Sequence, residues 1–228
     1  MKEPLLRVDR LGKDYYTAGR IKRVLRDISF SLREGEFVSL LGPSGCGKTT
    51  LLKCLASFIE PTEGSILVEG KKVKEPGPDR IMIFQDFNQL FPWKRVKGNL
   101  FFPLSLQIKD KEELKKRKAD SLEILRSVGL SDSADYYPHT LSGGMKQRAV
   151  IARALSLSPK ILLMDEPFCS LDVQIRASLQ DLLVSLWKER KLSILFVTHD
   201  LQEALILSQR VLVLSSDGKI KAEIENPL

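Results

Sequence analysis

The sequence predicts an α/β fold with a mostly parallel sheet, and three observations carry this prediction. First, an apolar run at residues 37–41 leads into a glycine-rich loop at 42–49 and then into a helix-compatible stretch at 50–58. Second, two later runs are continuously apolar. Third, a helix-compatible stretch precedes each of these runs, as expected for a parallel sheet covered on both faces. The runs are residues 161–164 and 192–197, and the helical stretches are residues 144–157 and 173–189.

The rest of the chain predicts further strands and one further helix. The first third of the chain contains short apolar runs separated by turn signals such as residues 34–35 and 76–78, which predicts β-structure. Apolar positions recur at helical spacing among charges over residues 111–128, and Gly129 is a suitable stop. Residues 210–224 predict a closing hairpin. The expected strands are residues 5–8, 28–32, 37–41, 65–68, 81–84, 210–214 and 219–224.

The composition is typical of a soluble globular protein. The chain has 228 residues, of which 43% are apolar and 29% charged, so it suits one compact unit and not a disordered or fibrous chain. A formal charge of +7 would suit nucleic acid or an anionic surface, but the basic residues are spread along the chain. The densest group, at residues 109–118, is mixed with acidic residues and indicates a solvated helical face.

The sequence gives no sign of a membrane span or an export signal. No apolar run approaches the ~18 residues that cross a bilayer, and residues 1–4 lead into no signal-peptide core. We therefore expect a cytoplasmic chain. Cys46, Cys54 and Cys169 are odd in number and have no paired spacing, which fits a reducing compartment better than a disulfide framework or a zinc site.

The loop at residues 42–49 predicts a phosphate-binding site, because it lies between a strand and a helix. Glycines allow backbone N–H groups to surround phosphate oxygens, and the helix N-terminus adds positive potential. Lys48 can reach the outer phosphates, and the Thr49 hydroxyl can hold Mg²⁺. The alternative is a glycine-rich turn before a helix, which the flanking elements make less favourable. The predicted nucleotide contacts are Gly42, Pro43, Ser44, Gly45, Cys46, Gly47, Lys48, Thr49 and Thr50.

Two carboxylates follow the apolar strand at residues 161–164. Asp165 and Glu166 should lie at the C-terminal edge of the sheet, where ligands of open α/β sheets collect. Asp165 is placed to hold Mg²⁺ through water, and Glu166 is placed to polarise the water that attacks a γ-phosphate. Glu166 is therefore the predicted catalytic base. An acidic turn after a buried strand is the alternative, and it explains less once the phosphate loop is taken into account.

A second helix N-terminus suited to phosphate lies at residues 141–148. Ser142 is a good N-cap, and Gly143 and Gly144 expose backbone N–H groups beside it. A protein that binds one nucleotide per chain seldom needs two such sites, so we expect them to serve different protomers. An ordinary capped helix is the alternative.

Together these motifs resemble the ATP-binding subunits of the ATP-binding cassette (ABC) transporter family over nearly the whole chain. The family's Walker A, signature and Walker B motifs match residues 42–49, 141–145 and 161–165, in the family's order. The resemblance implies a single domain with a P-loop NTPase core, an N-terminal antiparallel β-subdomain and an inserted α-helical subdomain. The implied limits are about residues 1–85 and 159–228 for the core and about 86–158 for the helical subdomain.

The resemblance also implies roles for further residues. Gln85 matches the Q-loop glutamine that contacts Mg²⁺ and the attacking water, and His199 matches the switch histidine at the γ-phosphate. A solvated glutamine and a structural histidine are the alternatives. Tyr15 matches the aromatic residue that stacks on adenine, although Tyr16 is close enough to compete. Asp172 in the matched D-loop can also be read as a helix N-cap.

These matches complete the expected site. The expected catalytic residues are Lys48, Gln85, Glu166 and His199, and the expected Mg²⁺ ligands are Thr49, Gln85 and Asp165. The signature residues that would contact the ATP of the other chain are Ser142, Gly143, Gly144 and Met145, and the D-loop residues at the dimer interface are Ser170, Leu171 and Asp172.

The resemblance further implies an ATPase at the cytoplasmic face of the membrane. In the family, two cassettes, identical or different, pair head to tail around ATP and Mg²⁺, and hydrolysis drives transmembrane permease subunits. A solute-binding protein outside the cytoplasm is an indirect partner. Residues 86–99, with the apolar Phe91 and Trp93, match the permease-binding segment. A hydrophobic lid over the chain's own core is the alternative reading of that segment.

Residues 86–99 and 144–148 resemble the importer branch that handles nitrate, sulfonates, taurine and thiamine-precursor pyrimidines. An export-type ATPase is an alternative that differs only in its partner. A soluble cassette acting on DNA or ribosomes is less favoured, because the sequence lacks the insertions or tandem cassettes usual in that class. We expect no nucleic-acid partner and read Trp93 and Trp187 as packing residues, since basic and aromatic residues are not interleaved near them.

Overall fold

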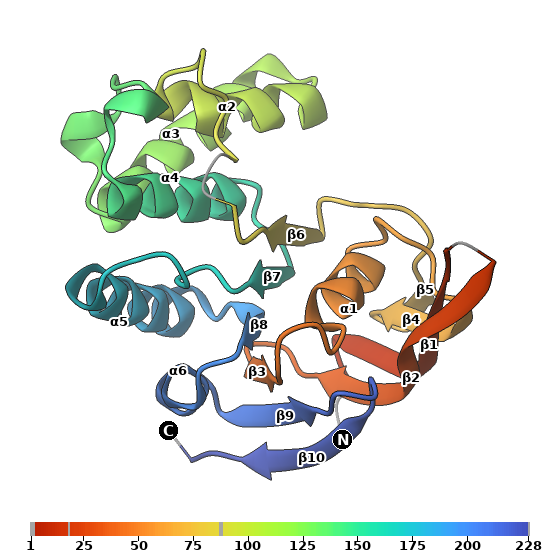
Figure 1. Cartoon of the computed structure of the whole chain (residues 1–228). Coiled ribbons are helices and arrows are strands. Elements are labelled where there is room, and N and C mark those ends of the chain that lie inside the picture. The colour runs from red at the N-terminus through yellow and green to blue at the C-terminus, as the bar shows by residue number, and fades with distance from the viewer. Residues whose placement is uncertain (1–2, 18, 87–88, 228) are drawn as a thin grey trace. The chain divides into compact units, whose positions relative to one another are not determined.

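The computed structural model describes residues 3–17, 19–86 and 89–227 (Figure 1). The chain divides into two compact units, which are described separately. The core unit comprises Met1–Met82, Lys160–Glu166 and Trp187–Leu228, and the helical unit comprises Ile83–Pro159 and Pro167–Leu186. The helical unit thus includes residues 167–186, which the sequence analysis assigns to the core. Phe87 and Asn88, within the predicted permease-binding segment, lie outside the described residues.

The core unit contains an antiparallel sheet with the strand order β2-β1-β4-β5. Strand β1 pairs antiparallel with both β2 and β4. Strands β1 and β2 run well beyond the predicted segments 5–8 and 28–32. The additional residues are not predicted as strand because they show no simple apolar alternation, and residues 20–23 are exposed. The strand bounds are β1 Leu6–Thr17, β2 Arg20–Leu32, β4 Glu63–Val68 and β5 Lys71–Lys72.

A six-stranded sheet has the order β10-β9-β3-β8-β7-β6. Strand β3 pairs in parallel with β8 and β9, β7 pairs in parallel with β8, and β9 and β10 form an antiparallel hairpin. Every residue of β7 and β8 is buried, as their continuous apolar runs predict. The predicted α/β fold and closing hairpin are confirmed. The bounds are β3 Phe37–Leu41, β6 Arg80–Ile83, β7 Ile161–Asp165, β8 Ser193–Thr198, β9 Arg210–Leu214 and β10 Ile220–Glu225.

Aromatic side chains pack beside β3 in the core unit. Phe37 is fully buried, and its ring centroid lies 5.7 Å from that of Trp187 and 6.1 Å from that of Phe196. Trp187 Nε1 donates a hydrogen bond to the Gly35 carbonyl at 2.9 Å, which satisfies the polar atom of the indole. Trp187 is therefore a packing residue as predicted, whereas Trp93 is 70% exposed and the packing prediction for it is wrong.

The helical unit is built from α2, α3, α4 and most of α5, and α2, α3 and α4 pack against one another. Asp110 begins α3 by accepting a hydrogen bond from Glu113 N at 2.8 Å. Helix α2 is not among the helices expected from the sequence, because Pro103 lies inside it and proline usually interrupts a helix. The helix bounds are α1 Lys48–Leu55, α2 Val96–Gln107, α3 Lys111–Ser127, α4 Gly143–Ser156, α5 Val173–Arg190 and α6 Leu201–Leu207. Within the described ranges, none of the helices has the length and apolar character that a membrane crossing requires.

Candidate active site

The glycine-rich loop joins β3 to α1 in a conformation that requires its glycines. Gly47 caps α1 with φ at 109°, and a Cβ atom there would lie 2.9 Å from Leu25 and 3.0 Å from Val24. A Cβ on Gly42 would lie 2.6 Å from the Leu214 carbonyl oxygen. The backbone therefore packs too closely for side chains at these positions, and its N–H groups are left to line the loop. This cradle fits phosphate at the start of a helix.

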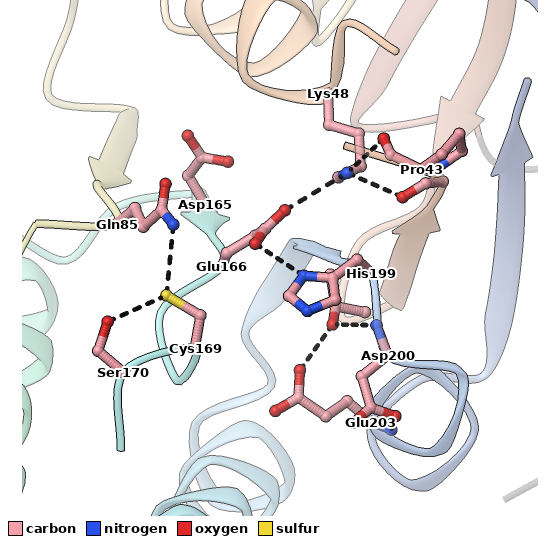
Figure 2. Close-up of polar contacts among 12 residues, drawn as sticks. Pro43, Lys48, Gln85, Asp165, Glu166, Cys169, Ser170, His199, Asp200 and Glu203 are labelled. Atoms are coloured by element: carbon pink, nitrogen blue, oxygen red, sulfur yellow. Dashed lines mark hydrogen bonds and ion pairs between the residues drawn. The ribbon is translucent and has the colours of Figure 1, made fainter. Parts of the chain in front are cut away.

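Lys48, the first residue of α1, turns its side chain back across the loop (Figure 2). Its ammonium group donates hydrogen bonds to the carbonyl oxygens of Gly42 at 2.8 Å and Pro43 at 3.0 Å. It also lies 3.3 Å from Glu166 Oε1 and is only 5% exposed. A buried positive charge beside the loop suits the recognition of phosphate oxygens.

Thr49 and Asp165 meet between α1 and the end of β7. Thr49 Oγ1 donates a hydrogen bond to Asp165 Oδ1 at 3.1 Å. Burial raises the pKa of the Asp165 carboxyl, and the nearby Glu166 carboxylate adds to the rise, whereas the hydrogen bond from Thr49 opposes it. A hydroxyl and a carboxylate are hard oxygen donors that fit Mg²⁺ held jointly by protein, phosphate and water. The described residues contain no cluster of three or more His, Cys, Asp or Glu side chains that could hold a metal ion without a phosphate.

Glu166 occupies a constrained position immediately after β7. Its φ is 44°, in the left-handed region that non-glycine residues rarely adopt. Its N–H donates to the Val197 carbonyl at 3.0 Å, and its Oε2 lies 2.8 Å from His199 Nδ1. With Lys48 near its other oxygen, the carboxylate is held from two sides. Such strained conformations persist where the surroundings fix them, and they are concentrated at functional sites.

The loop after β8 holds His199 in place. Thr198 Oγ1 donates to Glu203 Oε2 at 2.6 Å and accepts a hydrogen bond from Asp200 N at 3.0 Å. Asp200 caps α6 by accepting hydrogen bonds from the N–H groups of Gln202 and Glu203. Neither α6 nor Glu203 is among the features expected from the sequence. The signal was available, because an Asp followed three residues later by Glu resembles a capping box.

Tyr15 and Tyr16 are neighbours near the end of β1. In the β1–β2 pairing Lys13 lies opposite Leu25, and the side chains of both Leu25 and Val24 approach Gly47 of the phosphate loop. Tyr15 is 37% exposed, and Lys13 Nζ lies 5.4 Å from its ring centroid, whereas Tyr16 is 76% exposed. The choice of Tyr15 as the adenine contact stays a prediction.

The predicted signature residues lie at the start of α4 in the helical unit. Ser142 accepts a hydrogen bond from Met145 N at 3.3 Å, so its N-cap role is present. A Cβ on Gly144 would lie 2.7 Å from the Ile175 side chain, and one on Gly143 would lie 3.5 Å from Leu171. Close packing thus requires at least Gly144 to be glycine, independently of any nucleotide.

The predicted Q-loop and D-loop residues also belong to the helical unit. Gln85 Nε2 donates a hydrogen bond to Cys169 Sγ at 3.4 Å, and this sulfur lies 3.5 Å from Ser170 Oγ (Figure 2). Asp172 Oδ1 accepts a hydrogen bond from Ile175 N at 2.9 Å, as an N-cap of α5 does. Cys169 is not among the site residues expected from the sequence.

In the core unit the structure brings together Lys48, Thr49, Asp165, Glu166 and His199. A cationic loop that cradles phosphate, an oxygen pair suited to Mg²⁺ and a carboxylate contacted by a histidine define the class of P-loop nucleoside triphosphatases. The ABC transporter family model matches residues 25–169. The chain belongs to the ABC transporter family and is an ATP-binding ATPase cassette of that family.

Relatives agree with this assignment. The aliphatic sulfonates import ATP-binding protein SsuB of Bacillus cereus is 43% identical over 222 residues, which cover 97% of this chain and 86% of that protein. The nitrate import ATP-binding protein NrtC of Synechococcus elongatus is 45% identical over 192 residues, which cover 84% of this chain but only 29% of that longer protein. The dimeric structure of the bacterial ABC transporter cassette MJ0796 superposes with a TM-score of 0.83 at 32% identity, covering 98% of this chain and 99% of that one.

Proposed function

We propose that this chain binds and hydrolyses ATP with Mg²⁺ between two cassettes and thereby energises the import of a small solute. The observation that carries the proposal is the placement of Glu166 between Lys48 and His199, with contacts of 3.3 and 2.8 Å. This arrangement holds one carboxylate beside the phosphate loop, where a base for the attacking water is needed.

Different residues of the core unit would bind different parts of the ATP molecule. Backbone N–H groups of residues 42 and 44–47, together with the Lys48 ammonium, bind the phosphates, and Tyr15 stacks its ring on adenine. Thr49 and Asp165 would hold Mg²⁺, and Gln85 is proposed as a further contact of the metal or of the attacking water. When bound, Mg²⁺ neutralises phosphate charge and favours transfer to water.

Hydrolysis then depends on Glu166 and His199. Glu166 takes a proton from the attacking water, and His199 fixes the direction of the carboxylate through its Nδ1 contact. Fixing the orientation of the base favours proton transfer, because the carboxylate is already in the required rotamer when the water is bound. The remaining ring nitrogen of His199 is then available to the γ-phosphate.

The other side of the nucleotide would be closed by a second chain, identical to this one or not. Ser142, Gly143, Gly144 and Met145 of one chain would meet the γ-phosphate on the other, with Ser170, Leu171 and Asp172 at the same interface. The dimeric state of the related cassette MJ0796 supports this arrangement. ATP then joins the two chains, and its cleavage into two anions loosens them.

The proposed partner is a transmembrane permease, contacted at the cytoplasmic face of the membrane through residues 86–99. The names of the relatives favour import, because they specify nitrate, aliphatic sulfonates and bicarbonate. These solutes are small anions, so we propose a small anion or a related compound such as taurine as cargo. A solute-binding protein would deliver it to the permease.

Size measurement by light scattering tests the ATP-dependent pairing. Glu166→Gln with saturating ATP and Mg²⁺ should form a dimer, whereas the same variant without nucleotide should remain a monomer. Adding Ser142→Arg should abolish the dimer, because the new side chain would occupy the place of the partner's phosphate. A strictly monomeric Glu166→Gln protein, alone and with its permease, would overturn the proposal.

A further inference from the structure

Gln85 and Cys169 form a contact between two segments that are far apart in the sequence. Gln85 follows β6, and Cys169 lies between β7 and α5, but the carboxamide Nε2 donates to Sγ at 3.4 Å (Figure 2). The Gln85 side chain is exposed, whereas Cys169 is half-buried. An exposed glutamine has several accessible rotamers, and confining it to one of them costs side-chain entropy. The contact with Cys169 therefore restricts Gln85 to one side-chain orientation.

The two ends of a carboxamide have opposite hydrogen-bonding properties. With the NH₂ group directed at Cys169, the Gln85 Oε1 atom is the end left to face other groups. Mg²⁺ takes oxygen ligands and is repelled by N–H donors. The contact with Cys169 thus selects the amide orientation that is useful to a metal or to a metal-bound water.

The sulfur of Cys169 can accept the hydrogen bond from Gln85. Ser170 Oγ lies 3.5 Å from Sγ, and whichever of these two atoms donates, a sulfur lone pair stays available to the Gln85 NH₂ group. The loop is fixed on both sides of this contact. Leu171 N donates to the Phe168 carbonyl at 3.2 Å, and Asp172 caps α5 through Ile175 N.

We infer that Cys169 is a positioning residue that sets the orientation of the Gln85 carboxamide for ATP hydrolysis. The inference rests on the proposed function in one respect, that Gln85 acts on Mg²⁺ or on the attacking water. Cys169 itself touches neither. It links the loop that contains Gln85 to the loop that contains the interface residues Ser170, Leu171 and Asp172.

Side-chain amide NMR of the full chain tests the contact without any nucleotide. The carboxamide resonances of Gln85 are assigned by their loss in Gln85→Ala. Cys169→Ala should shift them, and Cys169→Ser should restore them in part, because a hydroxyl also accepts a hydrogen bond. The buried amide of Asn99 is the internal control, because it bonds to the carbonyls of Phe91 at 3.2 Å and Lys94 at 3.1 Å and should not move. Unchanged Gln85 resonances in Cys169→Ala would overturn the inference.

Metal binding and kinetics test the consequence. In Cys169→Ala, Mn²⁺ affinity measured by electron paramagnetic resonance with a non-hydrolysable ATP analogue should fall, and kcat should fall about two- to tenfold, the range for one neutral hydrogen bond. Cys169→Ser should recover most of both losses. In a Gln85→Ala background the Cys169→Ala change should have no further effect, and additive effects would overturn the inference.

The same set of variants separates this inference from the proposed role of Gln85. If Gln85→Ala itself leaves Mn²⁺ affinity and kcat unchanged, the proposed role of Gln85 is wrong and the inference is lost with it. If Gln85→Ala is impaired but Cys169→Ala behaves as the unaltered chain, only the inference is wrong.

Discussion

Glu166 Oε2 lies 2.8 Å from His199 Nδ1, and the register of two parallel strands produces this contact. Asp165 at the end of β7 pairs with Val197 near the end of β8. Residues that follow these positions leave the sheet at the same edge, so Glu166 and His199 meet although 33 positions separate them. The Glu166 N–H bond to the Val197 carbonyl fixes the same register at the backbone.

Glu166→Gln should reduce turnover about 10²- to 10⁴-fold, the usual contribution of a positioned base. The amide keeps the shape of the side chain but cannot accept the proton of water. ATP binding should persist, because the phosphate loop is unchanged. Phosphate release and binding of a fluorescent ATP analogue measure the two effects, and near-normal turnover would refute Glu166 as the base.

His199→Ala should bind ATP normally and hydrolyse it slowly. The change removes the group that directs the Glu166 carboxylate and leaves Lys48 and the loop intact. His139→Ala is a matched control, because His139 is the other histidine of the chain and lies in the helical unit. Single-turnover assays should show slow chemistry only for His199→Ala, and equal rates for both variants would contradict the assignment.

Lys48→Ala should weaken ATP binding or hydrolysis by about ten- to a hundredfold, the range for loss of a hydrogen bond from a charged group. The ammonium also bonds to the Gly42 and Pro43 carbonyls, so the loop itself should loosen. Lys53→Ala, on the same helix, is the control. Calorimetric titration with ATP separates binding from turnover, and the assignment of Lys48 fails if its variant matches the control.

Asp165→Asn should bind Mg²⁺ less well but should be more stable near neutral pH. Burial raises the pKa of the Asp165 carboxyl, so the folded state favours the protonated form. Stability from this group is full below the ordinary aspartate pKa and is lost as the pH rises through the raised pKa, which makes the carboxylate costly at pH 7. We expect a gain of about 1 kcal/mol, or about 2–4 °C in Tm.

Thermal melts at pH 4 to 8 check the Asp165→Asn prediction, because the advantage of the variant should grow with pH. Thr49→Val is a companion variant that removes the hydroxyl near the same carboxylate. A Tm for Asp165→Asn below that of the unaltered chain at pH 8 would show that the ionised carboxylate stabilises the fold.

The three cysteines should react with iodoacetamide in a fixed order: Cys169, then Cys46, then Cys54. Burial raises the pKa of the Cys54 thiol to about 11 and also raises the pKa of the Cys46 thiol. A raised pKa leaves little reactive thiolate at pH 7, so both reactions should be slow and should accelerate as the pH rises. Mass spectrometry of timed samples gives the order, and equal rates at Cys54 and Cys169 would contradict it.

ATP should protect Cys46 from this reagent. Its sulfur lies 2.9 Å from the position that a Cβ on Gly42 would occupy, inside the phosphate loop. Once labelled at Cys46, the chain should no longer bind nucleotide, because the adduct fills the cradle. Labelled chain that still binds ATP would refute the placement of phosphate in this loop.

The structure resolves several questions that local sequence patterns leave open. Helix α2 contains a proline and α6 is short, so neither has a strong periodic signal. The contact of Cys169 with Gln85 joins positions 84 apart in the sequence and has no sequence signal.

The sequence alone determined the phosphate loop, the buried parallel strands and the order of the motifs, because each is carried by consecutive residues whose spacing matches one strand, turn or helix. Only the tertiary structure decided which side chains meet. The β7–β8 register brings Glu166 next to His199. The Ile175 side chain packs against Gly144, so close packing as well as nucleotide binding favours glycine at that position. Such contacts depend on strand register and helix packing, which short-range spacing does not encode.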